Sequence, residues 1–316
     1  MDKYKIFYDA FQEAKWFQDL NKEFAEAELL PINQAKEPEV LRLLRYDKPD
    51  IILLKNDKAV LALEKTTEVP TGHNVGQRFA RIVCSAEEKV PFIYFFPFLA
   101  MKHGTYASAC WVNARLLEAM QKLSKIHSVP IMAINWECDK EYELIRDGSQ
   151  DLFLKAVVDD FIKHDYKGDI PILEKVHEVM KTKFDEALTR HPQYSDLPPT
   201  AREVITKEYL ESLSAKYKGK DFSKLLTREK SIVYDIGMKY VRSDPYTGTQ
   251  LIYDYLLARQ GATPKERSMN ILLRMPDISK ALWDKASTNK NRKDIKLYTK
   301  FADLIELSDD AIIIYE

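Results

Sequence analysis

Two short apolar runs, each interrupted by one acid, constrain this chain more than any other feature of its sequence. Residues 49–54 read Pro-Asp-Ile-Ile-Leu-Leu, and residues 60–64 read Val-Leu-Ala-Leu-Glu. The polar residues 55–58 between them predict a β-hairpin, because turn-forming side chains bound strands of this length. Asp50 begins one predicted strand and Glu64 lies within the other. Acids placed in this way can converge on one edge of a sheet, where two carboxylates suit a hard divalent cation such as Mg²⁺.

Length and composition describe an ordinary globular chain. Its 316 residues suffice for one large or two ordinary domains, and 45% of them are apolar while 31% are charged. No apolar run approaches the roughly 20 residues of a membrane-spanning helix. The first residues are charged and lack the apolar core of a secretory signal. We therefore expect a soluble, cytoplasmic protein that does not bind membranes.

Charge and cysteine content narrow the functional classes. A net charge of −1 excludes a grossly basic protein that coats DNA, but a DNA enzyme can confine its positive charge to one cleft. The three cysteines, Cys84, Cys110 and Cys138, are far apart, which argues against a disulfide framework and against a zinc knuckle. No pair of histidines has the spacing of a zinc hydrolase, and no glycine-rich phosphate loop is present.

The first half of the chain predicts an α/β core. Hydrophobic periodicity indicates helices and buried strands that form a βαβ unit in a mixed sheet. The segment 37–46 fits either a short helix or a first strand. The expected elements are an amphipathic helix within 8–28, the hairpin strands 50–55 and 59–67, a helix over 75–89, a strand over 90–96, a helix over 106–126 and a strand over 130–136.

The second half has a different pattern. After about residue 140 the sequence consists of long, charged segments with helical periodicity, separated by prolines. We therefore expect two parts: a core with its N-terminal helix over 1–140, and a mainly helical part over 141–316 that recognises DNA or forms a dimer. The apolar run 311–315 predicts a strand that joins the sheet or a partner subunit.

The alternation of side chains along the second hairpin strand groups the candidate residues. Glu64 and Thr66 share one face of the strand, while Lys65 points to the other. If Asp50 lies beside Glu64, one Mg²⁺ ion can contact both carboxylates, a phosphate oxygen and a water molecule. Hydrolysis of a phosphodiester bond follows from such a site. The alternative is a turn-ending Asp and a solvent-facing Glu with no chemical role.

Pro49-Asp50, a spacer, Glu64 on the next strand, and then a helix and a further strand resemble the PD-(D/E)xK nuclease superfamily. Restriction endonucleases are its largest group. The resemblance covers about residues 37–136 and implies a restriction-endonuclease-like fold, an α/β core with a central mixed sheet flanked by helices. It also implies that Asp50 and Glu64 bind Mg²⁺ and that the substrate is double-stranded DNA.

The sequence departs from the motif at its lysine. The superfamily has Lys two residues after the acid, and here that position is Thr66. A bulge could turn Lys65 toward the acids, Glu68 could assist from the same face, or Lys55 or Lys58 could reach in from the hairpin turn. Any of these residues could therefore orient the attacking water.

Further candidates lie outside the hairpin. Gln77 and Arg78 fall in the first turn of the following helix. In members of the superfamily, residues at this position often face the metal ion or the phosphate. A solvated helix start explains the two residues equally well. Lys290, Arg292 and Lys293 form a basic segment with polar neighbours that can face DNA phosphates or simply be solvated.

Together these features predict a Mg²⁺-dependent endodeoxyribonuclease, most naturally a type II restriction enzyme. Asp50, Glu64, Thr66, Lys65 and Gln77 are its candidate catalytic residues, and Asp50 and Glu64 its metal ligands. A homodimer fits this prediction, because enzymes that cut palindromes bring two active sites to two strands. The alternatives are a repair or defence nuclease and a non-catalytic nucleic-acid-binding protein on the same fold.

Overall fold

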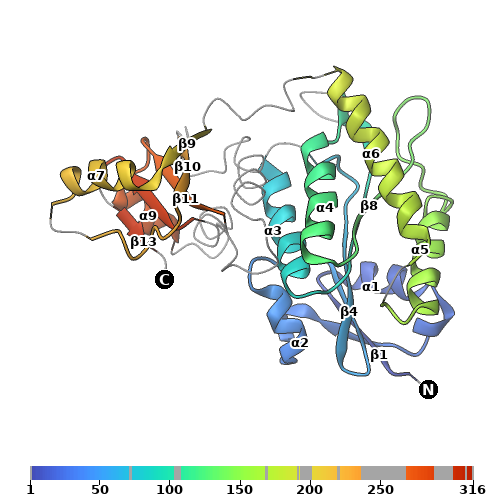
Figure 1. The fold of residues 1–316 in the computed structure, drawn as a ribbon. Helices are drawn as coiled ribbons and strands as arrows, with labels where there is room; N and C mark the ends of the chain where they lie inside the picture. Colours follow the sequence, from blue (N-terminus) through green and yellow to red (C-terminus); the bar gives the residue numbers. More distant parts are fainter. Residues whose placement is uncertain are drawn as a thin grey trace. The chain divides into compact units, whose positions relative to one another are not determined.

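A computed structural model describes most of the chain (Figure 1). Contacts divide the chain into two compact units, which are described separately below: residues 1–71 with 80–191, and residues 72–79 with 192–316. The described residues are 2–70, 73–102, 108–167, 170–190, 192, 201–218, 221–235, 268–287, 302–309 and 312–314.

The first unit is built on a mixed sheet of six strands. Its order is β2-β1-β3-β4-β5-β8, in which β4, β5 and β8 are parallel and β3 is antiparallel to both of its neighbours. The predicted α/β fold with a central mixed sheet flanked by helices is thus confirmed. The strands are β1 (Tyr4–Tyr8), β2 (Glu28–Pro31), β3 (Ile51–Lys55), β4 (Lys58–Lys65), β5 (Phe92–Phe96) and β8 (Ile131–Asn135), and a separate pair is formed by β6 (Leu99–Lys102) and β7 (Ser108–Trp111).

The predicted hairpin is present as β3 and β4. Its two-residue turn places Asn56 at φ 50° and Asp57 at φ 62°. Left-handed backbone at both turn positions matches the twist of the flanking strands, and Asn and Asp tolerate it better than most residues. The ladder shifts between Leu53 and Leu54, so the bulge lies far from Lys65.

Helices cover both faces of this sheet, and three of the predicted ones form with altered ends. The segment 37–46, which fitted a helix or a strand, is a short helix followed by a 3-10 turn at Arg42–Leu44. The N-terminal helix is shorter than the sequence predicted, because residues 22–24 form a 3-10 turn and residue 28 already begins β2, which pairs with β1. The helices are α1 (Phe11–Gln18), α2 (Pro38–Leu41), α3 (His73–Glu87), α4 (Ala114–His127), α5 (Asp151–Lys163) and α6 (Ile172–Arg190).

The described residues of the second unit differ from the mainly helical part that the sequence predicted. Its described residues contain a five-stranded sheet of order β13-β12-β11-β10-β9, with three parallel central strands and antiparallel strands at both edges. The prediction of a mainly helical second half is therefore wrong for this unit. The elements are β9 (Ala201–Ile205), α7 (Thr206–Lys216), β10 (Lys230–Asp235), β11 (Met269–Met275), α9 (Lys280–Ser287), β12 (Leu304–Leu307) and β13 (Ile312–Ile314).

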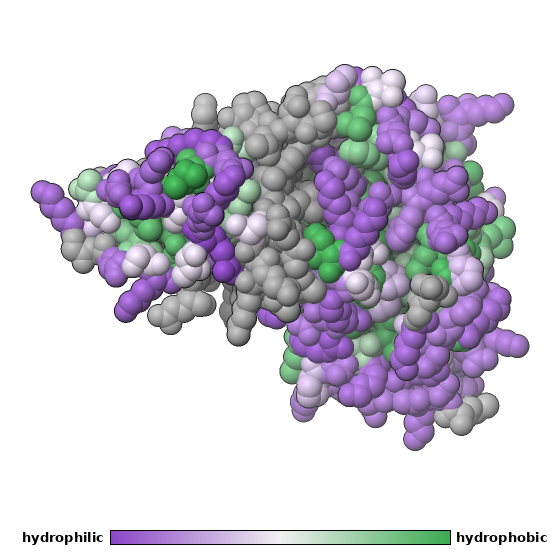
Figure 2. Space-filling view, in the orientation of Figure 1, coloured by the Kyte–Doolittle hydropathy of each residue, from purple (hydrophilic) through white to green (hydrophobic). Residues whose placement is uncertain are grey.

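The described surface and helices can be compared with the prediction that the protein does not bind membranes. Figure 2 shows a mainly hydrophilic described surface on this face, with apolar side chains in small, separate patches. Among the described residues, no helix combines the length and the apolar character needed to cross a bilayer.

Candidate functional site

The hairpin brings Asp50 and Glu64 to the same level of the sheet. Ile51 pairs with Leu63, so one further step of the antiparallel ladder sets Asp50 opposite Glu64. Asp50 lies just before β3, and its carboxylate accepts from the backbone N–H of Lys65, whereas the Glu64 carboxylate accepts from Arg81. The two carboxylates thus have different partners, and the environment of each decides what it can do.

Glu64 belongs to a buried ion-pair network. Only 3% of this residue is exposed, and its Oε2 accepts a hydrogen bond of 2.5 Å from Nη1 of Arg81 on α3. The same guanidinium donates from Nη2 and Nε to Oδ2 of Asp47, at 2.6 and 3.1 Å. The Glu64 carboxylate therefore already has a cationic partner on the α3 side of the sheet.

The Asp50 carboxylate has a different neighbour. Its Oδ2 accepts a hydrogen bond of 2.7 Å from the backbone N–H of Lys65, and its backbone carbonyl accepts one of 2.9 Å from the N–H of Asp9. These two bonds fix Asp50 where β3 begins and β4 ends. Asp50 itself is half-buried.

Lys65 extends to the face opposite Glu64, as the strand alternation predicted. Its ammonium lies over the ring of Trp16 on α1, 3.8 Å from the centroid, and 5.4 Å from that of Trp136. The Trp16 ring stacks on Phe95, the partner of Lys65 on β5. Burial lowers the pKa of Lys65, and the neighbouring carboxylates of Glu13, Asp151 and Asp50 oppose this effect.

Glu13, in the first turn of α1, is the second carboxylate near Asp50. Burial and then the negative charge of Asp50 raise the pKa of Glu13 to about 7, although the Lys65 ammonium acts in the opposite direction. Glu13 and Asp50 are thus two half-buried, like-charged groups in electrostatic contact. Such a pair gains from a cation placed between its members.

Asp151, the first residue of α5, completes the group. Its Oδ2 accepts a hydrogen bond of 2.9 Å from the indole N–H of Trp16. Its Oδ1 is buried and has no hydrogen-bond partner in the described part of the chain. Glu13, Asp50, Lys65 and Asp151 are called the Lys65 cluster below. The charges with the largest effects on Lys65, among the described residues, are these three carboxylates and the guanidinium of Arg146.

The donor set of the Lys65 cluster suits Mg²⁺ in part. Within the described residues, no three His, Cys, Asp or Glu side chains are arranged to hold a metal ion by themselves. Mg²⁺ commonly takes only one or two protein carboxylates and completes its shell with water and substrate phosphate. The Glu13 and Asp50 carboxylates provide such a pair of hard oxygen donors.

The chain was compared with protein-family models, with curated proteins and with solved structures. None of them matches it. The nuclease resemblance described above therefore rests on the residues and the topology of this chain alone.

Among the remaining predicted residues, the structure describes the side chains of Thr66 and Arg78. Thr66 is half-buried, and its hydroxyl accepts a hydrogen bond of 3.1 Å from the N–H of Glu68, which stabilises the turn after β4. Gln77 and Arg78 lie on α3; Arg78 is half-buried, and the side chain of Gln77 is outside the described residues. The predicted DNA-binding residues Lys290, Arg292 and Lys293 also fall outside the described part of the chain.

Sequence reasoning missed three residues of these networks. Glu13 and Asp151 each lie in the first turn of a helix, where an acid is the usual complement of the helix dipole and carries no functional signal. Arg81 lies in a helix whose apolar side was predicted correctly, next to Phe79 and Ile82. A charged residue on the buried face of a helix needs a partner, so Arg81 was the one signal in the sequence for an acid on the sheet that this helix covers.

The raised pKa of Glu13 predicts a pH-dependent stability. Its folded pKa, about 7, lies above the ordinary value of 4.5. Its protonation therefore contributes stability that is complete below 4.5 and is lost as the pH rises through 7. In EDTA, Glu13→Gln should be more stable than the wild type at about pH 8, by about 1 kcal/mol after allowance for solvent screening.

Denaturant unfolding of both proteins at about pH 5 and pH 8 measures this difference. Glu26→Gln changes an exposed acid outside the cluster and should leave the stability unchanged at both pH values. Equal stabilities of the wild type and Glu13→Gln at the higher pH would show that Glu13 is not held next to another negative charge.

Proposed function

We propose that the first unit is a Mg²⁺-dependent endonuclease for double-stranded DNA, with Asp50 and Glu13 as metal ligands and Lys65 beside them. The observation that carries the proposal is the joint environment of these residues. Asp50 accepts a hydrogen bond from the Lys65 backbone, and burial together with the negative charge of Asp50 raises the pKa of Glu13 to about 7. Two half-buried acids beside a half-buried lysine suit metal-assisted phosphodiester hydrolysis.

The charge balance supports a role for a cation. The carboxylates of the Lys65 cluster outnumber the cations around Lys65, so a phosphodiester would be repelled in the absence of a metal ion. When bound, Mg²⁺ supplies a Lewis acid that polarises the phosphate and acidifies a water molecule. Asp50 and Glu13 hold this charge in place. The Lys65 ammonium is held between two tryptophan rings and is near enough to compensate charge on the phosphate.

In this proposal Lys65 replaces the motif lysine expected at position 66. It lies next to Asp50 and Glu13, on the face opposite Glu64. Glu64 instead accepts a hydrogen bond from Arg81, which also donates to Asp47, and this network stabilises the packing of the hairpin on α3. A type II restriction enzyme that works as a homodimer is the form of this activity that the sequence favours.

A non-catalytic nucleic-acid-binding protein is the second candidate. One observation favours it. Glu64, which the sequence predicted as the second metal ligand, is only 3% exposed, and its carboxylate is hydrogen-bonded to Arg81. A protein of this fold that no longer hydrolyses DNA could keep this buried ion pair in the place where a nuclease binds its metal ion. The two candidates differ in whether DNA is cut.

Incubation with unmethylated phage DNA, in Mg²⁺ and in EDTA, tests the proposal when the products are separated on a gel. We expect discrete fragments in Mg²⁺ and intact DNA in EDTA. A smear in Mg²⁺ would retain the nuclease but remove the sequence specificity. Intact DNA in both conditions, from a folded protein that still shifts the DNA in a binding gel, would favour the non-catalytic candidate.

A further inference from the structure

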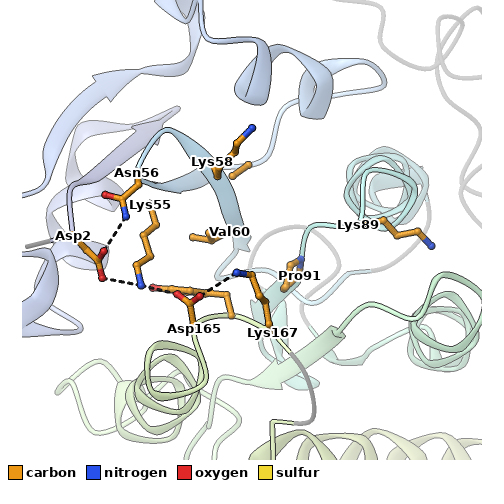
Figure 3. A pocket seen from close by; sticks show the side chains of 11 residues that line it. Asp2, Lys55, Asn56, Lys58, Val60, Lys89, Pro91, Asp165 and Lys167 are labelled. Carbon is orange, nitrogen blue, oxygen red and sulfur yellow. Dashed lines mark hydrogen bonds and ion pairs between the residues drawn. The ribbon is translucent and has the colours of Figure 1, made fainter.

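A second polar site lies at the hairpin turn of the first unit. It is a pocket of about 530 Å³ formed by the N-terminal residues, the β3–β4 turn and the segment that follows α5 (Figure 3). Four lysines line it, Lys55, Lys58, Lys89 and Lys167, against two acids. Its volume is in the range of pockets that hold small-molecule ligands.

The acids of this pocket are already neutralised. Lys55 Nζ lies 2.8 Å from Oδ2 of Asp2 and 2.7 Å from Oδ1 of Asp165. The second oxygen of Asp2 accepts a hydrogen bond of 2.9 Å from Nδ2 of Asn56, and that of Asp165 accepts one of 3.1 Å from Nζ of Lys167. Figure 3 shows this chain of contacts across the pocket. All four carboxylate oxygens therefore have donors.

The lysines retain an excess of charge and of donors. An ammonium has three N–H donors, so Lys55 and Lys167 have more donors than these carboxylate contacts use. Lys167 is 82% exposed, and Lys58 is 78% exposed with its nearest acid, Glu39, 3.8 Å away. The Lys89 side chain points away from the pocket in Figure 3 and donates to the carbonyl of His127, so its charge is not counted. Three lysines, Lys55, Lys58 and Lys167, against two acids leave the lining with a net charge of +1.

Part of the lining is apolar. Ala59, Val60 and Pro91 contribute to the wall between the lysines, together with the buried Tyr166. A pocket with apolar walls and a few charged groups can hold an anion while the remainder of the ligand packs on carbon. Net positive charge and spare donors select a ligand that carries several acceptor oxygens.

The pocket is separate from the Lys65 cluster. Lys55 is the last residue of β3 and Asp50 precedes the first, so the two sites lie at opposite ends of the same strand. Five residues of extended chain span roughly 16 Å. The pocket can therefore be tested without any assumption about catalysis at Asp50.

We propose that this lysine-lined pocket binds an anion of the phosphate class. The phosphate can belong to a free phosphorylated small molecule or to the backbone of a nucleic acid, and both present the same oxygens to the same lysines. Lys167 and Lys58 provide the exposed charge. Lys55 positions Asp2 and Asp165 and keeps their negative charge from repelling the ligand.

Calorimetric titration of the full chain with pyrophosphate tests the proposal. Lys167→Ala and Lys58→Ala should each weaken binding several-fold, about the effect of one exposed charge–charge contact. Lys163→Ala removes an exposed lysine from the adjacent helix, outside the pocket, and should leave the affinity unchanged. Asp2→Asn should tighten binding, since it removes a negative charge from the pocket and leaves Lys55 with fewer acid contacts.

A DNA duplex used as competitor separates the two sources of phosphate. If the duplex displaces pyrophosphate and its own binding weakens in Lys167→Ala, the pocket takes backbone phosphate. If pyrophosphate binds and the duplex does not displace it, the ligand is a free phosphorylated molecule. The proposal is overturned if no saturable pyrophosphate binding is found, or if Lys167→Ala and Lys163→Ala bind it equally. Circular dichroism of each variant confirms that a loss of binding is not a loss of fold.

Discussion

Asp50→Asn is expected to reduce Mg²⁺-dependent DNA cleavage by about 10³-fold or more, since a metal ion contributes several kcal/mol of charge stabilisation to the transition state. The substitution is nearly isosteric, and the side-chain carbonyl of Asn can still accept the hydrogen bond that the Lys65 N–H donates to Asp50. The hairpin should therefore keep its geometry. What the variant loses is the charge that, with Glu13, holds the cation.

The initial rate of cleavage of a defined duplex, in saturating Mg²⁺, measures this effect. Asp57→Asn is the matched control, because Asp57 lies in the turn of the same hairpin and its side chain is 74% exposed. Asn also accepts the left-handed backbone of that position. A folded Asp50→Asn variant that cuts DNA at the wild-type rate would remove Asp50 from the site.

Arg81→Met is expected to lower the free energy of unfolding by about 3–5 kcal/mol, the usual cost of leaving buried charges without their partner. The guanidinium forms ion pairs with two acids that are almost inaccessible to water, since Glu64 is 3% exposed and Asp47 is 9% exposed. Without Arg81, both buried carboxylates lose this cationic partner, so less of the cost of burying them is compensated.

Urea unfolding followed by circular dichroism gives this difference. Lys122→Met is the control, because the Lys122 side chain is 51% exposed and that of its partner Glu118 is 29% exposed, so this ion pair is much less buried. It should cost about 1 kcal/mol or less. A triple variant that also carries Glu64→Gln and Asp47→Asn should recover part of the loss. An Arg81→Met protein as stable as the wild type would mean that the network does not stabilise the hairpin against α3.

The strands of the core were predictable because local patterns determine them. The apolar run 51–54, the run 92–96 and the run 131–134 each form a strand whose residues are fully buried. Burial on both faces leaves a continuous apolar run in the sequence, and such a run is readable without any knowledge of tertiary structure. The alternation along β4 likewise placed Lys65 on the face opposite Glu64.

The partners of the candidate residues were not predictable, because they come from distant segments. Glu13 lies on α1 and Asp151 on α5, 138 positions away in sequence by the numbering. Neither has a local pattern that distinguishes it from an acid that caps a helix. Whether Glu64 meets a metal ion or an arginine depends on how α3 docks on the sheet, and no spacing rule supplies this information.

The prediction of a mainly helical second half was wrong for the second unit because the strands of that unit have weak local patterns. Its parallel strands β10 and β11 are separated by a long segment, and charged residues at their ends, such as Lys230, Asp235 and Arg274, mask short apolar centres. Arg274 pairs with Asp235 and Glu306 across neighbouring strands, so these charges are satisfied within the sheet. A periodicity search treats such strands as polar segments.

In the proposed site, Asp50 and Glu13 bind Mg²⁺ together, while Glu64 is held by Arg81. Calorimetric titration of Mg²⁺ into the wild type, Glu13→Gln and Glu64→Gln distinguishes these roles. We expect Glu13→Gln to weaken Mg²⁺ binding at least about tenfold, and Glu64→Gln, whose amide oxygen can still accept from Arg81, to bind as the wild type does. Binding that survives in Glu13→Gln and is lost in a folded Glu64→Gln protein would contradict these roles.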